Sequence, residues 1–356
     1  MNVCAKAAAP PARALTPGTL AWVLGSTGLL GAALCRALRA DGAALFQPTQ
    51  RFTWEEPAVL AEQIRHSVAA FALQVQACER WEIHWAAGVG TMGSPAEALV
   101  PETRALTLML ELLDGQAWVA AKPGKIVFAS SAGAIYAGSA DEVITEHSTP
   151  APTTAYAVQK LNQEDLVRSF VAANPSTSAL LARISTLYGP GQAASKKQGL
   201  LGYICRSIIR NQPVQIYVPF DTIRDYIDAD DAAQAMLGTA RSANQRSPVL
   251  LKIFASETPA TIAEILSIFK RLSRRTPLVV RSANQLSTLY TRRVQFKSVV
   301  SSEHVKLPGK RLPVGLSQLM RAEQMAYIKA SIPTLTLALA PKPTPTLTPT
   351  LTPTLT

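Results

Sequence analysis

Tyr156 and Lys160 are the two side chains of this sequence whose types and spacing suggest acid–base chemistry. A helix places residues i and i+4 on one face, so a helical segment here would bring a phenol beside an ammonium. A free tyrosine has a pKa of about 10, and a neighbouring cation favours its ionised form. The pair is therefore a candidate base near neutral pH. The alternative is a surface Tyr and Lys on an ordinary helix.

The sequence around this pair predicts the helix that the chemistry needs. Apolar residues recur behind it at amphipathic spacing, and two prolines stand ahead of it, where a helix can begin. These residues are Leu161, Leu166, Val167 and Phe170 behind the pair, and Pro150 and Pro152 ahead of it. The segment that holds Tyr156 and Lys160 is therefore predicted to be a helix.

Ser130 and Ser131 follow a predicted strand over residues 125–129. Open α/β sheets bind their ligands at the carboxyl ends of strands. The two hydroxyls are therefore expected beside a bound ligand. Another predicted strand, residues 82–85, leads into Ala86-Ala87-Gly88. These small residues allow a ligand to come close to the backbone. His84 is interpreted as a residue of that strand, because no second ligand stands at metal-binding spacing.

A glycine loop lies between a predicted strand at 21–24 and a helix marked by Leu30, Leu34 and Leu38. In this context the loop predicts a dinucleotide site, where backbone N–H groups and a helix N-terminus face a pyrophosphate. The alternative is a glycine-rich turn that only packs a helix closely on a strand. The expected binding residues are Gly25, Thr27, Gly28, Leu29, Leu30 and Gly31.

The second predicted strand, residues 43–46, bears on the choice of dinucleotide. A fold that prefers NAD would usually place an Asp or Glu after this strand for the ribose hydroxyls. This chain has Gln47 to Arg51 instead. Arg51 could meet the extra phosphate of NADP. We therefore expect NAD or NADP as cofactor, with a slight preference for NADP.

The composition sets limits on the class of protein. An apolar fraction of 48% can build a sizeable core, and four scattered cysteines indicate neither a disulfide framework nor a zinc site, which favours the cytoplasm. No apolar run reaches the roughly 20 residues of a membrane span.

Residues 241–330 hold sixteen Lys or Arg against four Asp or Glu. That surplus fits a site for a phosphorylated small molecule, a nucleic-acid-binding surface or a solvated basic face. We do not expect nucleic-acid binding, because few aromatic residues are interleaved with the basic ones.

The remaining stretches set the expected boundaries of the domains. Residues 1–18 are expected to be a disordered tail. From about residue 331 the chain becomes Pro/Thr/Leu repeats, which predicts a disordered tail over 331–356 because dense proline prevents a regular helix. Asp228 and the Asp230-Asp231 pair are expected to cap a helix at 232–237. Residues 241–330 are interpreted as a helix at 261–272 within less regular sequence.

The three motifs together resemble the extended short-chain dehydrogenase/reductases, in particular the NAD-dependent epimerase/dehydratase family that acts on nucleotide sugars. The resemblance covers about residues 20–235. Besides the glycine loop and the Tyr156 to Lys160 segment, it rests on three stretches, namely Phe128 to Tyr136, Arg183 to Gly191 and Thr222 to Tyr226. It implies an α/β fold, with a Rossmann-type doubly wound parallel sheet over 19–186 and a smaller C-terminal α/β substrate-binding part, interleaved with it, over 187–330.

The resemblance also implies roles for individual residues. Tyr156 would be the base, and Lys160 would lower its pKa and hold the nicotinamide ribose. A serine of the Ser130-Ser131 pair would hydrogen-bond the reacting sugar oxygen, and Ser131 is the better candidate because Ala132 replaces the usual Ser or Thr. Thr186 stands where the family commonly has a substrate-contacting Asn. Arg224 would meet the substrate diphosphate, which its planar fork suits.

The leading hypothesis is an epimerase or dehydratase of a nucleoside-diphosphate sugar that uses NAD(P) without consuming it, with a homodimer as the expected assembly. A dehydratase needs a further acid and base, which Ala132 and Gly133 do not supply, so epimerase ranks first. An NADPH-dependent reductase of a keto-sugar nucleotide is the second hypothesis. A non-catalytic dinucleotide-sensing protein is the third, although it would have little reason to keep Tyr, Lys and Ser together.

Overall fold

A six-stranded parallel sheet organises the protein in the computed structural model, which describes residues 18–191, 199–242, 247–281, 293–300 and 309–338. All neighbouring strands in the sheet are parallel. Across the sheet the order is β10 (Val249–Phe254), β5 (Thr177–Ile184), β4 (Gly124–Ser131), β3 (Arg80–Trp85), β1 (Thr19–Leu24) and β2 (Ala44–Phe46). The predicted Rossmann-type parallel sheet is confirmed.

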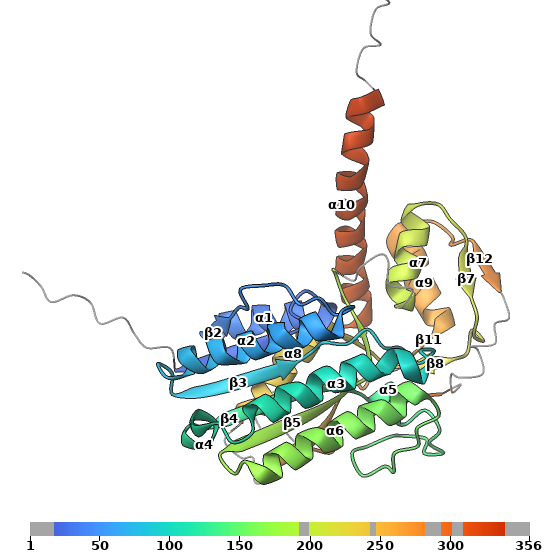
Figure 1. The fold of residues 1–356 in the computed structure, drawn as a ribbon. Helices are drawn as coiled ribbons and strands as arrows, with labels where there is room; N and C mark the ends of the chain where they lie inside the picture. The colour runs from blue at the N-terminus through green and yellow to red at the C-terminus, as the bar shows by residue number, and fades with distance from the viewer. Residues whose placement is uncertain (1–17, 192–198, 243–246, 282–292, 301–308, 339–356) are drawn as a thin grey trace, which may run out of the picture.

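Helices cover both faces of this sheet, as the doubly wound class requires. One face packs against α2 (Pro57–Val75), α3 (Ala96–Leu113), α4 (Ala117–Ala121) and α6 (Ala155–Ala173), and α3 and α6 run side by side in Figure 1. The other face packs against α1 (Leu29–Ala40) and α8 (Ala229–Ala240). Aromatic rings fill the first layer, where Phe71 lies 5.4 Å from Trp22 and 5.8 Å from Trp118 between ring centroids.

A smaller α/β part has its own apolar core. Its helices are α7 (Leu200–Ile209) and α9 (Ile262–Ser273), and its strand pairs are β7 (Val214–Ile216) with β12 (Val279–Arg281) and β8 (Ile223–Arg224) with β11 (Ala260–Thr261). A further pair, β6 (Thr186–Tyr188) with β9 (Tyr226–Asp228), leads into it. The short α5 (Ala132–Ile135) follows β4.

Strand β10 corrects the expectation of less regular sequence after residue 241. Val249–Phe254 pairs with β5 over six residues and forms an edge of the main sheet. Together with α8 it returns to the Rossmann core after the smaller part has begun, so the two parts interleave. The prediction that Asp228 caps α8 is confirmed, because its side chain accepts a hydrogen bond of 3.0 Å from the backbone N–H of Asp230. The helix begins at Ala229, earlier than expected, so Asp230 and Asp231 lie in its first turn and do not precede it.

Helix α10 (Leu312–Ala338) corrects the expected start of the C-terminal tail. It projects from the body of the protein (Figure 1) and includes residues 331–338, which were expected to be disordered. The expectation rested on dense proline, but Pro333 is the one proline in that stretch and the next is Pro341. A single proline removes one helical hydrogen bond and leaves the rest. Residues 339–356, like residues 1–17, lie outside the described residues.

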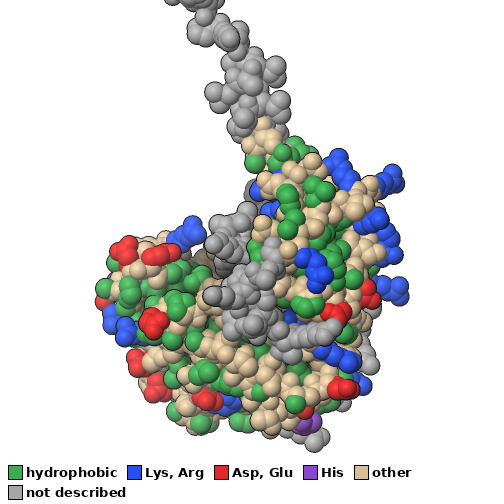
Figure 2. Space-filling view, turned by 90° about the vertical axis from the view of Figure 1, so that its right-hand side faces the viewer, with side chains coloured by type: hydrophobic (Ala, Val, Ile, Leu, Met, Phe, Trp, Pro, Cys, Tyr) green, Lys and Arg blue, Asp and Glu red, His purple; other side chains and the backbone are tan. Residues whose placement is uncertain are grey.

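The smaller part carries much of the basic surface. Four basic residues at the end of α9 are exposed, namely Lys270, Arg271, Arg274 and Arg275. Figure 2 looks onto this side of the molecule, where Lys and Arg side chains gather. Within the described residues, no helix combines the length and apolar character that a membrane span needs.

Candidate active site

The glycine loop lies at the point where the strand order of the sheet reverses. β1 pairs with β2 on one side and with β3 on the other, so the carboxyl ends of β1 and β3 flank a crevice where open α/β sheets bind ligands. Gly25 turns the chain there with φ +81°, and a Cβ on it would lie 2.6 Å from the Ala86 carbonyl oxygen. Only glycine fits this position.

The start of α1 is open to a ligand. Gly28 is the N-cap residue and provides no side-chain cap, so within the described part of the chain no capping side chain competes with a ligand for the first N–H groups of the helix. A Cβ on Gly31 would lie 2.1 Å from the Gly25 carbonyl oxygen, so the helix also packs too closely on the loop for any other residue. This backbone cradle fits the pyrophosphate of a dinucleotide.

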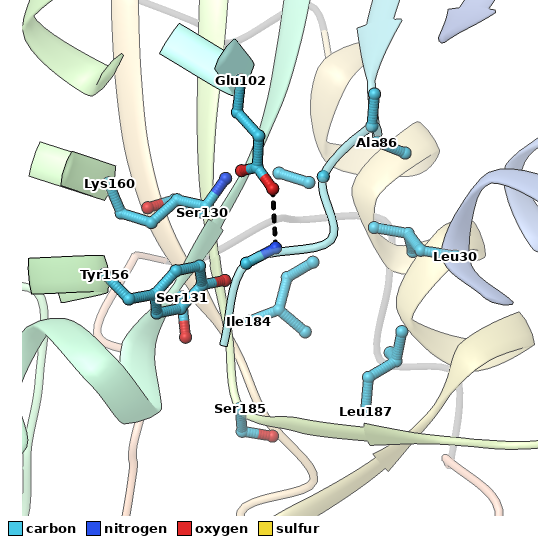
Figure 3. Close-up of a pocket in the computed structure, with 14 residues that line it drawn as sticks. Leu30, Ala86, Glu102, Ser130, Ser131, Tyr156, Lys160, Ile184, Ser185 and Leu187 are labelled. Atoms are coloured by element: carbon cyan, nitrogen blue, oxygen red, sulfur yellow. Dashed lines mark hydrogen bonds between the residues drawn. The ribbon is translucent and has the colours of Figure 1, made fainter. Parts of the chain in front are cut away.

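A cavity of about 190 Å³, open to solvent, lies beside this loop (Figure 3). Its wall comes from α1, β4, α6, α3 and the segments that follow β3 and β5. The lining residues are Leu30, Ala86, Ala87, Gly88, Gly90, Glu102, Ala129, Ser130, Ser131, Tyr156, Lys160, Ile184, Ser185 and Leu187.

Tyr156 and Lys160 both line the cavity from the first two turns of α6. The helix begins at Ala155, capped by Thr154, whose side chain accepts a 3.2 Å hydrogen bond from the N–H of Ala157. The Lys160 Nζ lies 5.8 Å from the centroid of the Tyr156 ring and 5.1 Å from that of Phe128. The predicted helix and the shared face are confirmed.

The pKa of Tyr156 differs from expectation. Burial raises the pKa of its phenol well above the ordinary value, the charge of Glu102 raises it further, and a hydrogen bond with Ser131 acts in the opposite direction. Lys160 is not among the groups that change the pKa of Tyr156 here, so its role in lowering that pKa stays a prediction. The physical reason for the raised pKa is that the phenolate would be desolvated beside a carboxylate.

Lys160 is buried at 5% exposure, and its ammonium donates a 3.0 Å hydrogen bond to Gln163 Oε1. Burial lowers the pKa of Lys160, whereas the carboxylates of Glu102 and Glu164 oppose that change. Lys160 thus lies between two acidic side chains, one from α3 and one from its own helix.

The two serines have different surroundings. Ser130 is buried, and its hydroxyl donates a 2.6 Å hydrogen bond to Glu164, which in turn binds Arg183 of β5. This commits its only proton and makes it a poor donor to a substrate. Ser131 is half-buried in the cavity wall next to Tyr156. Its hydroxyl accepts a 3.4 Å hydrogen bond from the N–H of Ala134, and of the two serines Ser131 is the one not bound to the buried carboxylate of Glu164.

Glu102 is a cavity residue that the sequence analysis did not identify. It is 7% exposed, and its Oε1 accepts backbone hydrogen bonds from Val89 at 2.5 Å and Gly90 at 2.6 Å. Figure 3 shows it facing the side of the cavity that Lys160 and Tyr156 line. Its place in α3 looks like any polar helix position, so no sequence pattern marks it.

Other predicted site residues lie outside the cavity wall. Among the predicted residues of the glycine loop, Leu30 alone lines the cavity. The others follow the end of β1 beside the cavity, namely Gly25, Thr27, Gly28, Leu29 and Gly31. Arg51 is exposed beyond β2, and Thr186 is exposed between two lining residues, Ser185 and Leu187. Arg224 lies in β8, where its guanidinium donates a 2.8 Å hydrogen bond to the Ile223 carbonyl. None of Arg51, Thr186 and Arg224 is among the residues that line this cavity, and their roles stay predictions.

A glycine cradle and a Ser, Tyr and Lys on one cavity wall define a dinucleotide-binding α/β protein of the extended short-chain dehydrogenase/reductase class. The model of the NAD-dependent epimerase/dehydratase family matches residues 21–250, more than half of the chain. The chain therefore belongs to the NAD-dependent epimerase/dehydratase family, a family of enzymes, and its cofactor class is NAD(P).

Individual relatives are more distant. A dTDP-4-dehydro-6-deoxyglucose reductase of Escherichia coli is 34% identical over 113 residues, which spans 32% of this chain and only 35% of that relative. Among solved structures, MoeE5 in complex with UDP-glucose and NAD has a TM-score of 0.68 at 21% identity, covering 87% of this chain and 100% of that one. RMD from Pseudomonas aeruginosa complexed with NADPH has a TM-score of 0.68 at 19% identity, covering 86% and 99%.

Proposed function

We propose that this protein transfers hydride at a carbon of a nucleoside-diphosphate sugar, with NAD(P) as cofactor and Tyr156 as the acid–base residue. The observation that carries the proposal is that Ser131, Tyr156 and Lys160 line one cavity together with Ala86 to Gly88, beside the glycine cradle. The matched E. coli relative and MoeE5 are named for a dTDP-sugar and a UDP-sugar, which supports the nucleotide-sugar class.

Each side chain has a role that its position allows. Oxidation of a sugar hydroxyl removes a hydride from carbon and a proton from oxygen, and the bound dinucleotide supplies the hydride acceptor. Tyr156 takes the proton in this direction and returns it in the other. Ser131 holds the reacting oxygen by hydrogen bonding, and Lys160 holds the cofactor ribose.

Epimerisation is the leading reaction. A dehydratase must also eliminate water with a further acid and base, and the residues that follow the serine pair, Ala132 and Gly133, provide neither. In an epimerase the hydride returns to the sugar, so the dinucleotide is not consumed. Thr186 and Arg224 are proposed as substrate contacts, with Arg224 on the diphosphate.

Net reduction of a keto-sugar nucleotide is the second candidate. The raised pKa of Tyr156 keeps it in the proton-donating form, which reduction of a carbonyl requires. Arg51 stands exposed after β2 in place of an acid, which supports a preference for NADP. A cytoplasmic location and a homodimer remain predictions, as does the absence of nucleic-acid binding.

Mass spectrometry of the purified protein, without added ligands, tests the substrate class. We expect a nicotinamide dinucleotide and a nucleoside-diphosphate sugar to come with the protein. Binding should then be repeated with UDP- and dTDP-sugars by calorimetry. Failure of every such sugar to bind in the presence of the dinucleotide would contradict the proposal.

A further inference from the structure

The carboxylate of Glu102 has one oxygen satisfied and one left without a partner. Oε1 accepts the N–H groups of Val89 and Gly90, and Oε2 is buried with no hydrogen-bond partner among the described residues. An unsatisfied buried carboxylate oxygen costs free energy. Loop support alone uses Oε1, so it does not explain why the chain keeps the second oxygen and the charge here.

Glu102 lies beside Tyr156 as well as beside the loop. A Cβ placed on Gly90 would lie 3.1 Å from Tyr156 Cδ2 and 3.3 Å from Glu102 Oε1, so the two side chains flank the same backbone position. Glu102 approaches from α3 and Tyr156 from α6, two helices that pack together. The Tyr156 ring and Oε1 of Glu102 therefore flank Gly90 from two sides, and the unpartnered Oε2 lies beside Gly88, where a Cβ would be 3.2 Å from it.

The other charges around Tyr156 leave Glu102 as its unbalanced acidic neighbour. On α6, Lys160 is the facing cation and Glu164 the second carboxylate. Glu164 is tied by Arg183 of β5 at 2.9 and 2.7 Å and by Arg168 at 3.2 Å. The residues of β4 that line the cavity are Ala129, Ser130 and Ser131, all of them neutral. A phenolate on Tyr156 would thus put a second negative charge next to Glu102, with Lys160 shared between them.

We propose that Glu102 is a third ionisable member of this site, a positioning residue that holds Tyr156 in its protonated, proton-donating form in the free protein. The inference rests on the proposed function only for the use that Tyr156 makes of its proton. It agrees with the direction in which the charge of Glu102 changes the pKa of Tyr156. It also gives the charged carboxylate a purpose that loop support does not.

Glu102→Gln separates the charge from the loop contacts. The glutamine keeps an oxygen for the N–H groups of Val89 and Gly90 but carries no charge. Glu111→Gln is the matched control, because Glu111 is an exposed glutamate of the same helix. Unchanged amide resonances of Val89 and Gly90 and an unchanged melting temperature would show that the loop is intact.

Ionisation of Tyr156 is followed by NMR of the ring-labelled tyrosine Cζ, with the resonance assigned by its loss in Tyr156→Phe. We expect Tyr156 of Glu102→Gln to ionise about 1–3 pH units below Tyr156 of the unmodified protein, the usual effect of one neighbouring charge. Glu111→Gln should not differ from the unmodified protein. The proposal is overturned if the Tyr156 resonance of Glu102→Gln moves no earlier with pH than that of the unmodified protein. No sugar is present in this titration, so its result does not depend on the substrate proposed above.

Discussion

Glu164 and Arg183 join the helix that carries Tyr156 and Lys160 to the neighbouring strand through two hydrogen bonds, 2.9 Å from Nε to Oε1 and 2.7 Å from Nη2 to Oε2. Both side chains are buried. Arg183 also donates a 2.6 Å hydrogen bond to the Tyr136 hydroxyl. The ion pair therefore fixes α6 against β5 just below the cavity.

Glu164→Gln should lower the free energy of unfolding by about 3–5 kcal/mol, because it leaves Arg183 as a buried charge without its partner. Chemical denaturation measures this. Asp165→Asn is the control on the same helix, since Asp165 is exposed and forms its ion pair with the partly exposed Arg168. It should change stability by about 0.5 kcal/mol or less. Equal effects of the two substitutions would mean that the buried pair does not hold α6.

The choice of dinucleotide is tested by Arg51→Ala. NADP(H) should bind the unmodified protein at least as tightly as NAD(H). The substitution should weaken only the phosphorylated form, by about ten- to hundredfold, the value of a charge-assisted hydrogen bond. Calorimetric titration of both dinucleotides measures this, with Arg271→Ala as the control, because Arg271 is an exposed residue of α9. A clear preference of the unmodified protein for NAD would show that the loop after β2 does not select the phosphate.

Arg224→Ala tests where the substrate diphosphate binds. It should weaken a nucleoside diphosphate by about ten- to hundredfold and leave dinucleotide binding nearly intact. Raising the salt concentration should weaken the same ligand, because exposed charges are screened beyond about 10 Å at 0.1 M. If the protein instead bound DNA with a steep salt dependence and no nucleoside diphosphate, the basic smaller part would serve nucleic acid.

The pH dependence of kcat/KM follows from the raised pKa of Tyr156. A raised pKa keeps the phenol protonated to higher pH, and kcat/KM reports the free enzyme. Sugar oxidation needs the phenolate, so its kcat/KM should rise about tenfold per pH unit through pH 7 and above. Carbonyl reduction needs the phenol and should be flat over the same range. A plateau of the oxidation rate already at pH 7 would contradict the raised pKa.

The sequence predicted those parts of the protein that depend on local patterns. The glycine loop needs residues without a Cβ at Gly25 and Gly31, and the helix at Tyr156 follows from its own apolar spacing. Strand β10 was missed because Lys252 suggests an exposed position, whereas the fold buries it and gives its ammonium a 3.0 Å hydrogen bond to Ser298.

The site residues that sequence analysis missed or misjudged depend on distant contacts. Glu102 gains its role from Val89 and Gly90, which return to it from the end of β3. For the serine pair, the family resemblance favours Ser131, and the contact of Ser130 with Glu164 of α6 gives a structural reason for that preference. Charge and burial of this kind arise when separate elements meet, which no local pattern records.

Single-turnover formation of reduced nicotinamide by Tyr156→Phe is the most direct test of the proposed reaction. The protein is loaded with oxidised dinucleotide and mixed with the sugar nucleotide identified by mass spectrometry. Turnover should fall by about 10²–10⁴-fold, as for a lost general base, while dinucleotide affinity stays unchanged. Tyr327→Phe, on an exposed turn of α10, should match the unmodified protein. Unchanged turnover by Tyr156→Phe would contradict the assignment of Tyr156 as the acid–base residue.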